Sequence, residues 1–187
     1  MTPLEFPYIT DDGKMTVNTL FQSSVDNPDC NNETGEDIAT LEIVNTSDSY
    51  LREAKVNVTL TDGTAYAFTA TDLPAGTKAW IFAEDNASVT IDAACKKISC
   101  QNEYIEQEWL DGISAECSDT QILLTNNTDS VARNVLVGCH CMIADTSFGG
   151  VTYEYYVDEI PAHGSVTIEA SDCYLGNAEV VYLQTKE

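Results

Sequence analysis

The sequence predicts an all-β protein made of two tandem antiparallel β-sandwich repeats. A repeat is the first observation behind this prediction: Val44–Arg52 (VNTSDSYLR) returns as Thr125–Arg133 (TNNTDSVAR), and Asp72–Gly76 (DLPAG) returns as Glu159–Gly164 (EIPAHG). The second is a series of short alternating apolar segments, separated by Gly, Pro, Asn or Asp about every ten residues. An internal repeat makes each copy one supersecondary unit with its own apolar face.

The first copy is expected to cover residues 1–94. Asp12-Gly13 opens it, an alternating segment from Met15 to Leu20 follows, and the acidic loop 21–37 is an insertion that the second copy lacks. Asp62-Gly63 marks a hairpin turn. Period-two alternation predicts the inward-facing residues of the strands beside this turn. They are Val56, Val58 and Leu60, then Tyr66, Phe68 and Ala70, with Trp80 and Phe82 on a further strand.

The second copy is expected to cover residues 111–187, after a connecting segment 95–110. Asp111-Gly112 opens it, and its alternation predicts inward-facing residues Val137, Cys139 and Cys141, then Tyr153, Tyr155 and Val157, then Val166 and Ile168. Additional residues are expected in a hairpin around Asp145–Gly150, and His163 is expected to lengthen the Pro-Ala-Gly turn. For the joint at 93–110, a strand pair and a short helix both remain open.

The charge distribution limits the partners of this protein. Acidic residues number 31 and basic residues 8, which gives a formal net charge of −23. Such a charge repels phosphate backbones and anionic membrane surfaces, so no nucleic acid is expected as a partner. No apolar run is long enough to insert this segment into a membrane. A soluble acidic surface, binding of cations or basic partners, and adaptation to high salt are the alternatives for the charge itself.

Two stretches, residues 40–82 and 121–168, carry an apolar residue followed by x-Asn-x-(Thr/Ser), a polar turn and an alternating strand. The first stretch then has Leu-Pro-Ala-Gly and the second has Ile-Pro-Ala-His-Gly. This order resembles the small immunoglobulin-like β-sandwiches of bacterial envelope proteins, of the FxLYD and CARDB kind. Thr61 departs from the pattern where an aromatic residue is expected, and the second copy lacks the Asp-Gly pair. The resemblance implies two tandem immunoglobulin-like repeats that act as a non-catalytic interaction or spacer module with an unknown protein or glycan partner.

The same resemblance implies an extracellular or cell-envelope location, with the cytoplasm as the alternative. The start of the chain, Met1–Phe6, lacks the basic and apolar regions of a secretory signal. The sequence is therefore expected to be either an intracellular protein or a segment of an exported one.

A calcium- or carbohydrate-binding module is the alternative function. Asp29, Asn31 and Glu33, preceded by Asp26, have the alternate spacing of oxygen ligands at the start of a calcium loop. Calcium is thus the cofactor considered, although Thr34 stands where an EF-hand loop needs Gly. A solvated acidic loop is the competing interpretation.

The chain has seven cysteines, so at least one thiol stays unpaired in a monomer. Cys95 and Cys100 are the disulfide candidates in an oxidising compartment. Cys139-His140-Cys141 resembles a set of metal ligands, but alternation on a strand points His140 away from both thiols. Core thiols, disulfides with Cys117 or Cys173, and a metal site all remain open.

Two further patterns concern ligands and chemistry. Tyr156, Tyr50 and Trp109 are aromatic residues in positions compatible with a ligand-binding face. A hydrolase that uses paired carboxylates is the remaining alternative. Its candidate pairs are Asp11 with Asp12, Asp158 with Glu159, and Glu106 with Glu108. No glycine-rich phosphate loop and no nucleophile motif occurs, so an enzyme is not expected.

Overall fold

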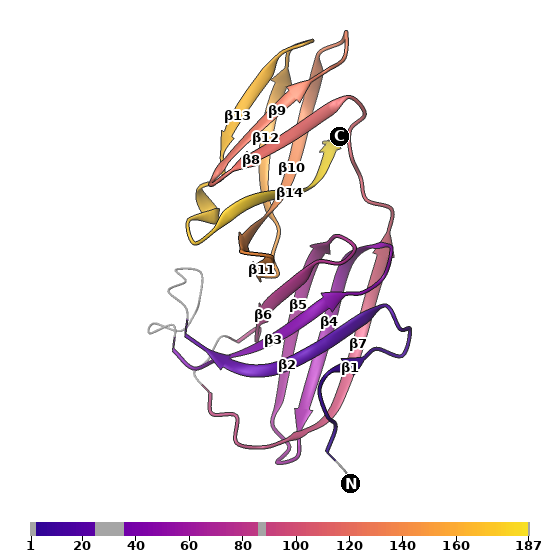
Figure 1. The fold of residues 1–187 in the computed structure, drawn as a ribbon, viewed down its shortest axis with the longest axis vertical. Coiled ribbons are helices and arrows are strands. Elements are labelled where there is room, and N and C mark those ends of the chain that lie inside the picture. The colour runs from indigo at the N-terminus through magenta and orange to yellow at the C-terminus, as the bar shows by residue number, and fades with distance from the viewer. Residues whose placement is uncertain (1–2, 25–35, 86–88, 187) are drawn as a thin grey trace. The chain divides into compact units, whose positions relative to one another are not determined.

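The described part of the chain forms β-strands and one short 3-10 helix, so the predicted all-β class is confirmed (Figure 1). The computed structural model describes residues 3–24, 36–85 and 89–186. The chain divides into two compact units, Met1–Ile105 and Glu106–Glu187.

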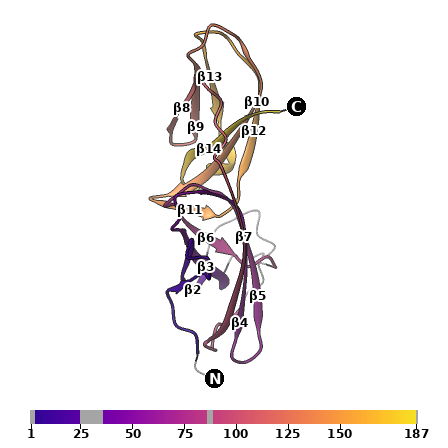
Figure 2. The ribbon, with the colours of Figure 1, turned by 90° about the vertical axis from the view of Figure 1, so that its right-hand side faces the viewer.

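In the first unit two sheets face each other across an apolar core (Figure 2). Its strands are β1 (Tyr8–Ile9), β2 (Met15–Ser23), β3 (Ile38–Asn45), β4 (Tyr50–Leu60), β5 (Ala65–Leu73), β6 (Lys78–Phe82) and β7 (Cys95–Ile105). One sheet has the order β1-β2-β3-β6 and the other β5-β4-β7, with antiparallel neighbours throughout. The six inward-facing residues predicted for β4 and β5 are all buried in this core.

The second unit, like the first, has two sheets around an apolar core, and here each sheet has three main strands. Its elements are β8 (Ile113–Ser118), β9 (Gln121–Asn126), β10 (Ala132–Ile143), β11 (Thr146–Gly149), β12 (Tyr153–Ile160), β13 (Ser165–Glu169), the 3-10 helix η1 (Ser171–Cys173) and β14 (Asn177–Thr185). The sheets have the orders β8-β9-β13 and β12-β10-β14, and the short β11 pairs with the end of β10. The predicted inward residues of β10, β12 and β13 all belong to the core or pack against it.

The strand orders of the two units correspond. β2-β3-β6 of the first unit matches β8-β9-β13 of the second, and β5-β4-β7 matches β12-β10-β14. A cross-strand ion pair repeats as well. Nη1 of Arg52 lies 2.8 Å from Oδ1 of Asp72, and Nη1 of Arg133 lies 2.7 Å from Oε2 of Glu159. β11 occupies the hairpin in which additional residues were expected.

A buried asparagine organises one end of the first unit. The Asn45 side chain is fully buried, and its Nδ2 donates hydrogen bonds to the carbonyl oxygens of Ser49 (2.8 Å) and Leu73 (2.9 Å). Its Oδ1 accepts a hydrogen bond from the Ser47 hydroxyl (2.7 Å). Because a buried amide must be hydrogen-bonded, this side chain fixes the turn between β3 and β4 and ties it to the end of β5.

Asn126 does the same in the second unit. It is also fully buried, and its Nδ2 donates to the carbonyl oxygens of Ser130 (2.7 Å) and Ile160 (3.1 Å). Its Oδ1 accepts a hydrogen bond from the Thr128 hydroxyl (2.8 Å). The repeated Asn-x-(Ser/Thr) sequence therefore encodes a repeated turn.

The joint between the copies differs from the expected connecting segment 95–110. Cys95–Ile105 form strand β7, which pairs with β4 from Tyr50–Ile105 to Leu60–Cys95 and therefore belongs to the first unit. A strand pair and a short helix were both open here, and the structure has a single strand.

His163 is not an insertion, and the predicted lengthening of its turn is wrong. Four residues separate β5 from β6 and β12 from β13. The amide of Thr77 donates to the Pro74 carbonyl, as the amide of Gly164 does to that of Pro161. His163 therefore takes the place of Gly76, and both have left-handed backbones, with φ of 54° and 78°.

Candidate functional site

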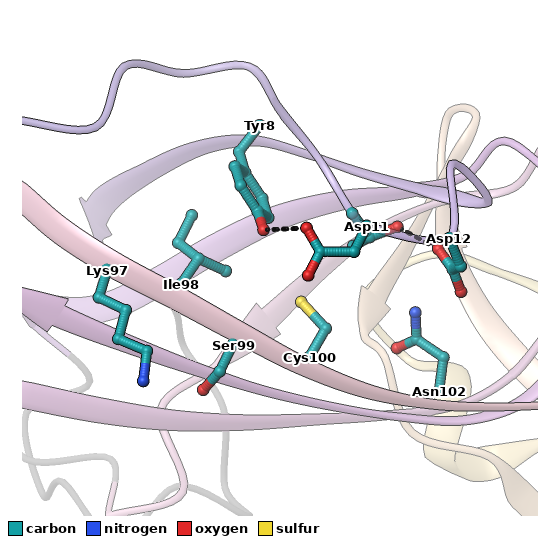
Figure 3. A pocket seen from close by; sticks show the side chains of 9 residues that line it. Tyr8, Asp11, Asp12, Lys97, Ile98, Ser99, Cys100 and Asn102 are labelled. Carbon is teal, nitrogen blue, oxygen red and sulfur yellow. Dashed lines mark hydrogen bonds between the residues drawn. The ribbon is translucent and has the colours of Figure 1, made fainter.

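A pocket of about 330 Å³ lies in the first unit between the turn after β1 and strand β7 (Figure 3). Its lining residues come from two short stretches that are distant in sequence. They are Tyr8, Thr10, Asp11, Asp12, Lys97, Ile98, Ser99, Cys100 and Asn102.

The N-terminal segment forms one wall of this pocket. The Leu4 amide donates a hydrogen bond to the Cys95 carbonyl oxygen (2.8 Å), and Tyr8-Ile9 then pairs with β2 as strand β1. Leu4, Phe6 and Tyr8 all pack against the core, because alternate residues of an extended segment share a face. The segment therefore runs from an edge strand of one sheet to the edge of the other and covers the core at this side.

The turn that follows holds the two aspartates in place. Gly13 has φ of 70°, and its amide donates to the Thr10 carbonyl oxygen (2.8 Å). Asp12 Oδ1 accepts hydrogen bonds from the Thr10 hydroxyl (2.5 Å) and the Lys14 amide (3.0 Å). The Thr10 hydroxyl in turn accepts the Met15 amide (3.1 Å). Asp12 is thus part of the turn, whereas the exposed Asp11 is available to a ligand.

The side chains of β7 complete the pocket. Figure 3 shows Cys100 pointing toward Asp11, Asn102 toward Asp12, and Lys97 away from both aspartates. The Tyr8 hydroxyl lies 3.5 Å from Asp11 Oδ1. The pocket therefore places a carboxylate beside a thiol and a phenol, with no cation between them.

The pKa shifts follow from this arrangement. Burial and the nearby charges of Asp12 and Asp11 raise the pKa of the Cys100 thiol to about 11. Burial and the Asp11 carboxylate raise the pKa of Tyr8. Burial opposes ionisation of Asp12, but hydrogen bonds from Thr10 and the Lys14 amide outweigh it, so the pKa of Asp12 is lowered. At neutral pH Asp12 is thus ionised, while the Cys100 thiol and the Tyr8 phenol keep their protons.

This chemistry suits binding better than covalent catalysis. A cysteine nucleophile needs a lowered pKa, and the pKa of Cys100 is raised. The two histidines of the chain are His140 and His163, both in the second unit. The pocket therefore offers the exposed Asp11 carboxylate, which can pair with a cationic ligand, beside a neutral thiol and a neutral phenol.

The predicted calcium ligands lie outside the described residues: Asp26, Asp29, Asn31 and Glu33 all fall within 25–35. In the described ranges, no three His, Cys, Asp or Glu side chains are arranged to hold a metal ion.

The predicted Cys95–Cys100 disulfide is not formed, and both thiols are free. The two residues lie on the same strand, β7. Five steps of about 3.3 Å separate their Cα atoms by about 16 Å, whereas a disulfide requires about 4.4–6.8 Å. Cys95 is buried in the core, and Cys100 lines the pocket instead.

The three predicted ligand-face aromatics do not form one face. Tyr50 is only 4% exposed, so it is a core residue of the first unit, whereas Tyr156 is 50% and Trp109 is 41% exposed. Tyr156 lies on β12, one edge of its sheet, and its hydroxyl donates to Asn134 Oδ1 (2.7 Å). Trp109 follows Glu108, whose carbonyl accepts the Leu183 amide of β14 at the opposite edge. A carbohydrate platform made of these three residues is therefore not present.

The candidate pair Asp158 and Glu159 does not converge on one site. Asp158 and Glu159 are successive residues of β12, so their side chains point to opposite faces, and Glu159 pairs with Arg133. Asp11 and Asp12, in contrast, both line the pocket described above.

Cys139 and Cys141 are core thiols, as the alternation predicts, and His140 points the other way. Its Nδ1 lies 2.9 Å from the Ser147 hydroxyl and its Nε2 lies 3.2 Å from the Thr152 hydroxyl. Both partners belong to the additional hairpin of the second copy, which explains how a buried histidine is accommodated there.

Sequence reasoning did not bring Tyr8, Cys100 and Asn102 together. Tyr8 is separated from Cys100 and Asn102 by most of the first unit, and it becomes their neighbour because the N-terminal segment crosses from β7 to β2. The single local signal was Asp11-Asp12 beside Gly13.

Comparison with known proteins gives no match: neither a protein-family model nor a curated protein matches this chain. Within the described residues, the structure has no helix that is long and apolar enough to cross a membrane.

Proposed function

We propose that this chain is a non-catalytic interaction or spacer module built from two immunoglobulin-like β-sandwiches in tandem. The matching strand orders of the two units support the repeat. The residues that the copies share, such as Asn45 and Asn126, hold turns together and carry no reaction. The proposed extracellular or envelope location rests on the resemblance to repeats of the FxLYD and CARDB kind.

The pocket at Asp11 is the observation that carries the proposed role in binding, because the second unit does not repeat it. Cys100 stands opposite Val56 on β4, and the equivalent residue opposite Val137 on β10 is Leu183. Leu183 is a buried core residue. The pocket is thus a feature added to one copy of a common framework, as expected for an individual binding function.

The partner is inferred to present a lysine or arginine side chain. The exposed Asp11 carboxylate provides the charge, and the protonated Cys100 and Tyr8 leave it uncompensated. The net charge of −23 attracts a basic partner at long range and so favours encounter.

A peptide-binding measurement tests this proposal. A fluorescent peptide with one central arginine among neutral residues is titrated with the full chain, and its anisotropy is compared with that of a peptide with glutamine at the centre. Asp11→Asn is expected to weaken binding of the arginine peptide about fivefold or more. Asp92→Asn, which removes the same charge from an exposed position of the same unit, is the matched control and is expected to have little effect.

Equal losses in the two variants would show that net charge alone attracts the peptide, and the pocket would be rejected as the site. Hydrolysis of chromogenic glycosides or esters that is abolished by Asp11→Asn would reject the non-catalytic role.

Protease treatment of intact native cells tests the location, because an envelope protein exposed to the exterior is cleaved while cytoplasmic markers are not.

A further inference from the structure

Three cysteines gather in the core of the second unit. Cys139 and Cys141 lie on the inner face of β10, and Cys173 ends the 3-10 helix η1. All three are at most 2% exposed. Sγ of Cys139 lies 3.9 Å from Sγ of Cys173, which is van der Waals contact between the two sulfur atoms.

We propose that Cys139 and Cys173 form a disulfide when the protein meets a disulfide oxidant such as oxidised glutathione. One protein thiolate attacks the oxidant, which releases one glutathione thiolate and leaves a mixed disulfide. The second protein thiolate attacks that mixed disulfide and releases the second glutathione. The two protein thiols are oxidised, the oxidant is reduced to two thiols, and the two protons pass to the released glutathione molecules.

Among the cysteines that the structure describes, the surroundings of the others single out this pair. Cys95 and Cys100 lie on one strand of the first unit and are too far apart to bond to each other. Cys117 is exposed on β8. Cys141 also lies close to Cys173, and a hydrogen bond between these two thiols raises the pKa of Cys141. Cys139 is assigned as the partner on the 3.9 Å distance between its Sγ and that of Cys173, and the digest described below distinguishes it from Cys141.

The disulfide would link η1 to β10, the central strand of the sheet β12-β10-β14. The residues between Cys139 and Cys173 include β11, β12 and β13, so the disulfide closes a loop that contains three strands of the unit. Closing such a loop restricts the unfolded chain and stabilises the folded one. Both sulfurs are buried, and the hydrogen bond with Cys139 together with burial raises the pKa of Cys173 to about 12. The reaction is therefore expected to be slow until this region opens.

Thiol counting on the full chain tests the proposal. The reduced protein is incubated with oxidised glutathione at pH 8, unfolded in acid, and alkylated with N-ethylmaleimide, and its mass is measured. The number of alkylated thiols is expected to fall from seven to five. A proteolytic digest is expected to contain a peptide pair joined through Cys139 and Cys173. The melting temperature of the oxidised protein is expected to rise by about 5 °C or more and to return after reduction.

Two variants sharpen the result. Cys173→Ser is expected to keep all of its remaining thiols, whereas Cys117→Ser, the control at an exposed position, is expected to lose two. If Cys173→Ser does not fold, the digest of the unmodified sequence decides. Seven retained thiols, a glutathione adduct without an internal bond, or a Cys141–Cys173 peptide would each overturn the proposal.

Discussion

The ring of Tyr182 on β14 lies directly over Gly138 on β10. A Cβ atom added at Gly138 would meet atoms of this ring at 2.3–2.6 Å, closer than any real contact. The Tyr182 hydroxyl donates a hydrogen bond to Glu154, which lies opposite Gly138 on β12. The side chain therefore spans all three strands of its sheet, and it is 2% exposed.

Gly138→Ala is expected to lower the free energy of unfolding of the second unit by about 1–3 kcal/mol, because the added methyl group displaces the Tyr182 ring. In a Tyr182→Ala background the same substitution is expected to cost much less. Denaturant unfolding of the four proteins of this double-mutant cycle measures the coupling. Equal costs in both backgrounds would show that the ring contact does not determine the effect.

Asn45→Ala and Asn126→Ala are each expected to destabilise their own unit by about 2 kcal/mol or more, because several buried backbone and hydroxyl groups lose their partner. Asn57→Ala is the control, since Asn57 is exposed on β4. The chain has two tryptophans, one in each unit. A Trp109→Phe background leaves Trp80 to report unfolding of the first unit, and a Trp80→Phe background leaves Trp109 for the second. A loss below about 0.5 kcal/mol in either asparagine variant would contradict the assigned role.

An exchange of residues tests the equivalence of Gly76 and His163. Gly76→His is expected to cost about 1–2 kcal/mol, because a side chain in the left-handed region strains the backbone. His163→Gly is expected to change stability by less than about 0.5 kcal/mol, since removing that strain offsets the loss of an exposed pair with Asp129. Thermal melts measure both. A cost above about 1 kcal/mol for His163→Gly would mean that its side chain has a structural role beyond the turn.

Strands β4 and β5 could be predicted from sequence because each has one buried face and therefore alternates, as Val56, Val58 and Leu60 do. For β6 the predicted inward face was wrong: Ala79 and Ile81 are buried, whereas Trp80 and Phe82 are only partly buried. β7 could not, because Cys95–Ile105 lies at a sheet edge and has only Cys95 and Ile98 buried. The repeat alignment identified Cys139 and Cys141 as core residues. The same alignment misplaced His163, because comparing Pro-Ala-Gly with Pro-Ala-His-Gly does not reveal that a histidine can adopt the backbone conformation of a glycine. The pocket depends on the packing of the N-terminal segment beside β7, two segments distant in sequence, which no local pattern encodes.

The first unit is expected to lose stability as the pH rises from about 9 to about 12. Burial and neighbouring aspartates raise the pKa of Cys100 from 9.0 to about 11. Burial and Asp12 raise that of Tyr104 from 10.0 to about 12. The unfolded chain loses these two protons first, so unfolding is favoured once the pH exceeds the unfolded pKa values, and the loss is complete above the folded ones. Below about pH 9 both groups are protonated in both states and contribute no pH dependence.

Tyr104→Phe isolates one of these groups. The buried Tyr104 hydroxyl lies beside Asn102, but within the described residues it makes no hydrogen bond of good geometry, so at pH 7 the variant is expected to be about as stable as the original protein. Between about pH 10 and 12 its stability is expected to fall less steeply, and Cys100→Ser is expected to flatten the curve between about 9 and 11. Urea unfolding followed through Trp80 in the Trp109→Phe background gives the two slopes. A slope unchanged in both variants would assign the alkaline loss to other groups, because the protons released on unfolding would then not come from Cys100 or Tyr104.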